Sequence, residues 1–123
     1  MATALRYFNP VTGVTKGKLD VFANITNSFT AIHQAPVVGV KTVSTTAAEL
    51  FAGSTSRLAN RYLMAVFNES SNTVYWGPSG VTTATGFTLL PQDSVVFQFD
   101  PTADTAIYFI AGADSSVRVV ELA

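Results

Sequence analysis

Few side chains of this chain are of a type that does acid–base or metal chemistry, and those few lie far apart. His33 is the single histidine, and it stands in the apolar stretch Ala31-Ile32-His33-Gln34-Ala35-Pro36 without an acidic neighbour. A general base or a metal ligand needs partners that orient it or share the ion. We therefore expect His33 to be structural. The absence of cysteine excludes a thiol nucleophile, a disulfide scaffold and a thiolate zinc site.

The acidic residues lie in expected turns or at the ends of expected strands. A calcium site could be built from Asp100 and Asp104 with loop carbonyls, although aspartates in turns usually hydrogen-bond to nearby backbone, and Asp114 has the same setting. Glycoside hydrolysis needs two acids that face one cleft, whereas the glutamates are scattered (Glu49, Glu69 and Glu121). Neither a GxSxG nucleophile elbow nor a phosphate-binding GxxxxGKS or GxxxxGKT pattern occurs. We expect no enzyme, no bound metal and no cofactor.

Two large aromatic residues, Tyr75 and Trp76, stand together beside the turn Gly77-Pro78-Ser79-Gly80. Exposed aromatic side chains of this kind could stack on a sugar ring or anchor a protein interface. Successive residues of a strand point to opposite faces, so one of the pair could equally be a core residue. The sequence leaves these alternatives open.

The chain is poor in charge. Of its 123 residues only 12% are charged, against roughly 25% in a typical soluble domain, and 16 threonines and 10 serines make the polar surface neutral. The net charge is −1 and the longest basic cluster is Lys16-Gly17-Lys18, so we expect no nucleic-acid partner. No apolar run approaches 18 residues and the first residues lack a leader pattern. We therefore expect no membrane partner and synthesis in the cytoplasm.

Short β-branched and aromatic runs alternate with turn residues and predict an all-β fold. Tight turns between such short strands favour an antiparallel β-sandwich or a small jelly-roll-like barrel. The best helix candidate, Thr46–Ala52, is short and is followed by Gly53. The expected strands are Val37–Ser44, Arg61–Asn68, Thr73–Gly77, Gly86–Leu90, Ser94–Phe99, Thr105–Ala111 and Ser116–Leu122.

Alternation within two of these strands indicates which face each residue occupies. In Ser94–Phe99, the residues Val95, Phe97 and Phe99 share the face expected to be core. In Ser116–Leu122 neither face is wholly polar, which is typical of a strand that is covered on both sides or lies at an interface.

Residues 1–36 differ from the rest of the chain. Prolines, glycines and asparagines separate four isolated aromatics, Tyr7, Phe8, Phe22 and Phe29, and these are too widely spaced to build a core of their own. A disordered tail is usually poor in aromatics. We interpret residues 1–36 as an extended N-terminal arm and residues 37–123 as a β-sandwich domain. The alternative is that the segment adds two strands to the sandwich, with Leu19–Ile25 as one of them.

A distinctive order of strand and turn motifs runs from about Val43 to Glu121. It comprises Arg61 to Asn68, a short Ser/Asn turn, Val74-Tyr75-Trp76-Gly77, Val81-Thr82-Thr83, Gly86-Phe87-Thr88-Leu89-Leu90-Pro91, Ile107-Tyr108-Phe109-Ile110-Ala111 and Val117-Arg118-Val119-Val120-Glu121. In this order, which covers about two thirds of the chain, the sequence resembles a small virion-associated β domain that recurs among tailed bacteriophages.

The resemblance implies a non-enzymatic virion structural protein, most similar to capsid decoration (cement) proteins. Such a protein would sit on the capsid surface, bind the major capsid protein and form a homo-oligomer, with a trimer favoured. Sparse charge over a large surface fits burial against other subunits, with an intersubunit area of about 1,600 Å² or more. The candidate interface residues are Tyr7, Phe8, Phe22, Phe29, Tyr75 and Trp76.

Two other functions remain open at this stage. One is a tail, fibre or head-to-tail component, which keeps the structural role and changes the symmetry. The other is a glycan-binding module at a tail tip, with Tyr75 and Trp76 as stacking residues.

Overall fold

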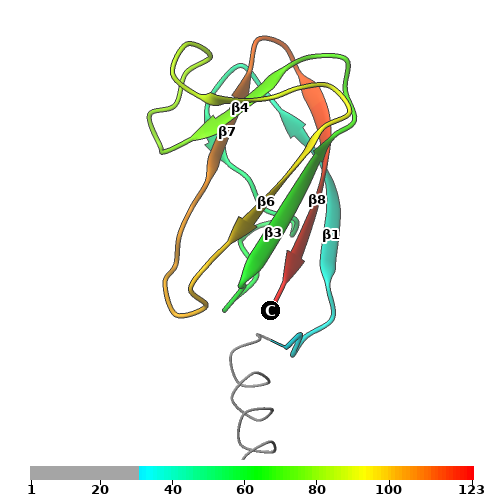
Figure 1. Cartoon of the computed structure of the whole chain (residues 1–123), viewed down its shortest axis with the longest axis vertical. Coiled ribbons are helices and arrows are strands. Elements are labelled where there is room, and N and C mark those ends of the chain that lie inside the picture. The colour runs from blue at the N-terminus through cyan, green and yellow to red at the C-terminus, as the bar shows by residue number, and fades with distance from the viewer. Residues whose placement is uncertain (1–30) are drawn as a thin grey trace, which may run out of the picture. The chain divides into compact units, whose positions relative to one another are not determined.

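Residues 31–123, which the computed structural model describes, form eight short strands joined by tight turns and by longer loops (Figure 1). β-branched and aromatic side chains, which suit a pleated and half-buried surface, dominate these strands. The strands are β1 (Val37–Val43), β2 (Ala48–Glu49), β3 (Leu63–Asn68), β4 (Val74–Gly77), β5 (Phe87–Leu89), β6 (Ser94–Gln98), β7 (Tyr108–Ala111) and β8 (Ser115–Leu122). The expected all-β class is confirmed, and this part of the chain contains no α-helix.

The strands pair as one long hairpin that is rolled upon itself. β1 pairs with β8, β2 with β7, β3 with β6 and β4 with β5, always antiparallel. These pairs fall alternately into two four-stranded sheets, ordered β1-β8-β3-β6 (sheet A) and β2-β7-β4-β5 (sheet B). β8 joins β3 in sheet A, and β7 joins β4 in sheet B. The connectivity is that of an eight-stranded jelly roll, a form of the predicted sandwich.

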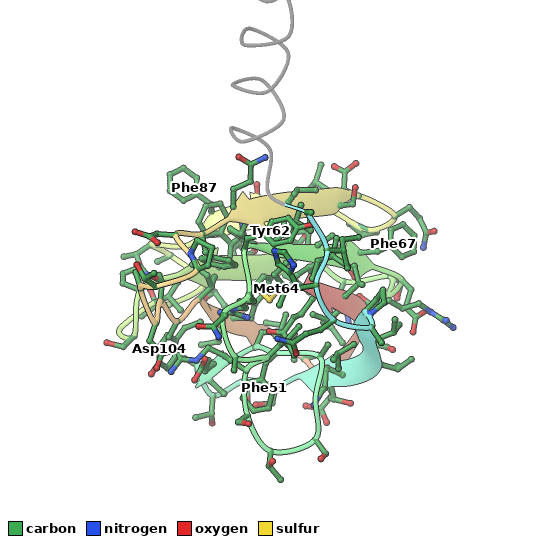
Figure 2. The ribbon with its side chains drawn as sticks, turned by 90° about the horizontal axis from the view of Figure 1, so that it is seen from below. Phe51, Tyr62, Met64, Phe67, Phe87 and Asp104 are labelled. Atoms are coloured by element: carbon green, nitrogen blue, oxygen red, sulfur yellow. The ribbon has the colours of Figure 1, made fainter. Side chains whose placement is uncertain are left out.

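The core lies between the two sheets. Phe97 of β6 meets Trp76 and Phe109 edge-on, with ring centroids 4.8 and 6.2 Å apart, an arrangement that adds about 0.5–1.5 kcal/mol per pair beyond burial. Val95 and Phe99 pack on the same core as Phe97, which confirms the alternation predicted for this strand. Figure 2 shows Met64 inside the molecule. The buried apolar residues of the central cluster are Val43, Leu50, Ala52, Met64, Val66, Val74, Leu89, Phe109, Ala111, Val117 and Val119.

The best helix candidate of the sequence, Thr46–Ala52, is not helical. Ala48–Glu49 forms β2 beside β7, and the Leu50 amide donates to the Ile107 carbonyl at 3.0 Å. Leu50 and Ala52 are both buried. Residues two apart are separated by about 200° around a helix, whereas they share one face of an extended chain. Burying both side chains therefore requires the extended form, which overrides a weak helix propensity.

Two other expected strands begin later than the sequence indicates. Strand β3 starts at Leu63 and β7 at Tyr108, because the residues before them form a contact between loops. The Arg61 guanidinium donates to the Thr105 carbonyl at 2.8 Å and lies 4.4 Å from the centre of the Phe99 ring. These residues close one end of the sandwich.

A buried ion pair lies at this end of the core. Arg61 is 5% exposed and Glu121 of β8 is fully buried, and Arg61 donates a hydrogen bond to the Glu121 carboxylate. The second carboxylate oxygen accepts the amides of Ala52 and Leu58 at 3.2 and 3.3 Å. Glu121 thus connects β8 to the long loop between β2 and β3. In the sequence alone, Glu121 is one of several scattered acids.

Asn68 is a second fully buried polar residue, at the opposite end of β3. Its amide nitrogen donates to the carbonyls of Asn72 and Leu89, at 2.7 and 3.0 Å. Its oxygen accepts the amide and the hydroxyl of Ser70, at 3.0 and 2.7 Å. One side chain therefore holds the β3–β4 turn and joins it to β5.

Gly39 of β1 allows a close approach between backbones. A Cβ atom at this position would lie 2.3 Å from the Ala52 carbonyl oxygen, which belongs to the loop that covers the inner side of β1. Gly39→Ala is therefore expected to lower the free energy of unfolding by about 1–3 kcal/mol through overpacking. Urea unfolding measures this change. Gly80→Ala is the control, because a Cβ there meets no atom within 4 Å, and an equal loss in both variants would contradict the prediction.

The extended arm predicted for residues 1–36 lies mostly outside the described residues, as do Tyr7, Phe8, Phe22 and Phe29. Strand β1 begins at Val37, the first residue of the predicted sandwich domain. The arm interpretation and its alternative, two additional strands, both remain predictions.

Candidate interaction surface

The side of sheet A that faces away from the core is largely apolar. The register places Val38, Val120, Ala65 and Val96 opposite one another, in one row across β1, β8, β3 and β6. The next row contains Val40, Arg118, Phe67 and Ser94, and Leu63 pairs with Leu122 in the row on the other side. We call this surface the outer apolar face, made up of Val38, Val40, Leu63, Ala65, Phe67, Val96, Val120 and Leu122.

Several of these side chains remain exposed in the folded domain. The exposed fraction is 67% for Val38, 58% for Val40, 55% for Val96 and 37% for Phe67, and Phe67 projects outward in Figure 2. Single exposed apolar residues are ordinary, whereas a contiguous patch marks an interaction site. A shallow depression lies over the centre of the two rows. The outer apolar face is therefore the candidate functional surface.

The charged side chain on this face, Arg118, is paired. Its guanidinium donates to the Glu69 carboxylate at 2.7 Å, and the Ser116 hydroxyl donates to the same carboxylate at 2.5 Å. Hydrogen bonds from Arg118 and then Ser116 lower the pKa of Glu69 below its ordinary value, and Glu69 raises the pKa of Arg118. Arg118 therefore adds little net charge to the centre of the face.

This pair makes stability depend on pH. Because the folded pKa of Glu69 is lowered, its contribution is present above the unfolded pKa and is lost as the pH falls through the folded pKa. Glu69→Gln is expected to lower the Tm at pH 7 and to flatten the decline in Tm from about pH 5 to about pH 3. Thermal unfolding at a series of pH values measures both effects. Arg118→Gln should flatten the dependence of Tm on pH in the same way. If both variants keep the wild-type dependence of Tm on pH, the Glu69–Arg118 pair is not its cause.

The outer side of sheet B is partly covered by the loop between β4 and β5. Val81 of this loop is buried and lies against Gly77, where a Cβ would come within 3.0 Å of the valine side chain. A Cβ added at Gly86 would likewise lie 2.8 Å from the side chain of Tyr75. The two outer faces therefore differ, since Val38, Val40 and Val96 of sheet A remain exposed.

Tyr75 and Trp76, two of the predicted interface residues, point to opposite faces of β4. Trp76 points toward Phe97 between the sheets and stacks on the exposed Phe87 at a centroid distance of 5.0 Å. Tyr75 lines a shallow polar groove with residues of three loops (Ser71, Asn72, Thr73, Thr83, Gly112 and Ala113). The structure does not bring the two aromatics together as one stacking platform.

The remaining candidates from the sequence have local roles. His33 is exposed, and its backbone amide donates to the Ala123 carbonyl. The Asp100 carboxylate accepts the amide and the hydroxyl of Thr102, at 2.9 and 2.7 Å, and these bonds lower its pKa. Asp104 pairs with Arg57. Within residues 31–123 no three acidic or histidine side chains gather as a metal site.

The outer apolar face as a whole is not evident from the sequence. A signal for it was present in β8, where Val120 and Leu122 face away from the core. The same signal occurs in β1, where Val38 and Val40 alternate with inward residues. Which strands lie beside each other depends on pairing between distant segments, so the separate signals could not be combined into one surface.

Comparison with family models, curated proteins and solved structures finds no match to this chain. Between residues 31 and 123, no helix has the length and the apolar character needed to cross a membrane.

Proposed function

We propose that this chain is a non-enzymatic structural protein of a bacteriophage virion. In this proposal it decorates the head, binds the major capsid protein and forms an oligomer that stabilises the capsid. The observation that carries the proposal is the outer apolar face, because a chain whose surface is poor in charge also presents a contiguous apolar patch. Such a surface is suited to burial against other subunits.

The architecture supports this role by analogy. Jelly rolls of eight strands recur in viral capsid domains and in lectins. A fold does not determine a function, so the analogy strengthens the proposal only together with the exposed surface. The segment 1–36, with Tyr7, Phe8, Phe22 and Phe29, is proposed to contact neighbouring subunits.

Binding to phage heads tests the proposal directly. Purified protein is added to expanded heads that lack it, and bound protein is measured as a function of concentration. We expect saturable binding and a higher temperature of head breakage. Bovine serum albumin at equal concentration is the control for nonspecific protection. Absence of saturable binding would overturn the decoration role.

A glycan-binding role is the second candidate, and the polar groove beside Tyr75 is the observation that favours it. The polar residues that line this groove together with Tyr75 are Ser71, Asn72, Thr73 and Thr83. A glycan array with the wild type and Tyr75→Ala tests this role. Phe87→Ala is the control, since Phe87 is an exposed aromatic outside the groove. Binding lost only in Tyr75→Ala would favour glycan recognition.

A further inference from the structure

We infer that a second copy of this chain binds to the outer apolar face of sheet A. The second copy uses its own outer apolar face for this contact. This inference extends the proposed function. It rests on the proposed function in one respect, namely that many copies are held on one surface. A modest contact is effective where many copies are held on one surface, because a high local concentration replaces intrinsic affinity.

The surface shape of this face favours a flat partner. The row formed by Val38, Val120, Ala65 and Val96 crosses all four strands with side chains of small or medium size. The four strands lie side by side in Figure 1. Two sheets pack naturally face to face at about 10 Å. The chain itself presents a flat apolar sheet surface of the required kind.

The charge distribution also permits contact between identical faces. Arg118 lies in the second row, and its charge is compensated by Glu69 at 2.7 Å. Two copies can therefore approach without unpaired like charges at the centre of the contact. A strongly basic or acidic partner would find no complementary field on this face.

The size of the face agrees with one contact among several. Its strands contain 7, 8, 6 and 5 residues, so the usual strand spacing and rise give about 400 Å² in projection. With the relief of the side chains, two faces bury on the order of 1,000 Å², near the lower limit for a specific interface. We expect a dissociation constant in the micromolar range or weaker. The area of about 1,600 Å² expected from composition then requires other contacts as well.

A matched pair of lysine variants tests the inference. Val96→Lys places a charge at the β6 end of the apolar row that crosses the proposed contact, and the two-fold symmetry of a contact between identical faces makes it act twice. Leu90→Lys adds the same charge at a residue of similar exposure, 52% against 55%, in the loop between β5 and β6. The full-length proteins are compared by sedimentation velocity from about 5 to about 500 µM, after thermal unfolding has shown that each is folded.

We expect the wild type and Leu90→Lys to form dimers as the concentration rises, and Val96→Lys to dimerise at least about tenfold more weakly. Val38→Lys, at the opposite edge of the same row, should have the same effect. A wild type that stays monomeric overturns the inference, as does an oligomer of any size that neither variant weakens. Head binding is measured separately, so failure of the dimer contact is distinguishable from failure of the decoration role.

Discussion

Glu121→Gln is expected to lower the free energy of unfolding by about 3–5 kcal/mol, because it leaves the Arg61 guanidinium buried without its counter-charge. Glu121 is fully buried and Arg61 is 5% exposed, so water can replace little of the lost interaction. The amide of the new glutamine still offers an oxygen to the backbone amides of Ala52 and Leu58. Urea unfolding at pH 7 measures the loss.

The double variant Arg61→Met/Glu121→Gln separates the cost of the unpaired charge from the cost of altered shape. It removes both charges, so it should recover at least half of the stability that Glu121→Gln loses. Glu69→Gln, which breaks the exposed pair with Arg118, should cost much less. A double variant as unstable as Glu121→Gln would show that the charge is not the main cause.

Asn68→Ala is expected to lower the free energy of unfolding by about 3 kcal/mol, since a buried polar group that loses its partner costs about 1–3 kcal/mol. The carbonyls of Asn72 and Leu89 lose a donor, and Ser70 loses an acceptor. The turn between β3 and β4 then separates from β5. Thermal unfolding of the purified variant measures the effect.

Asn68→Leu distinguishes hydrogen bonding from packing at this position. Leucine has the branched shape of asparagine, is larger and makes none of its hydrogen bonds, so we expect it to be at least as destabilising as alanine. Ser71→Ala, at an exposed neighbour, should leave the Tm nearly unchanged. Recovery of stability in Asn68→Leu would assign the effect to a cavity instead.

The all-β class and most strands could be predicted from the sequence because their signals are local. β-branched runs bounded by turn residues specify Val37–Val43 and Ser94–Gln98 almost to the residue. The two-residue strand β2 could not be predicted, because its extended form depends on burial of Leu50 and Ala52 under distant strands. Local propensity predicts secondary structure least well where such tertiary contacts determine the backbone conformation.

The candidate site was less predictable than the fold. The sequence could show that one side of β8 is not polar, but the row from Val38 to Val96 exists only because β1 and β6 flank the pair β8 and β3. Glu121 could not be assigned to the core for the same reason. Its partner Arg61 is far from it in the sequence, and charged residues are rarely buried unless they are paired.

The central position of β8 determines when this fold can form during synthesis. Sheet A cannot be completed before Ser115–Leu122 has left the ribosome, because β8 is the strand that joins β1 to β3. Until then the valines of β1 and β3 have no pairing partner in the middle of the sheet. Such distant pairing is slow and exposes the nascent chain to aggregation. We therefore expect sheet A to fold only after β8 has emerged, so chaperone access before that point would govern the yield of folded protein.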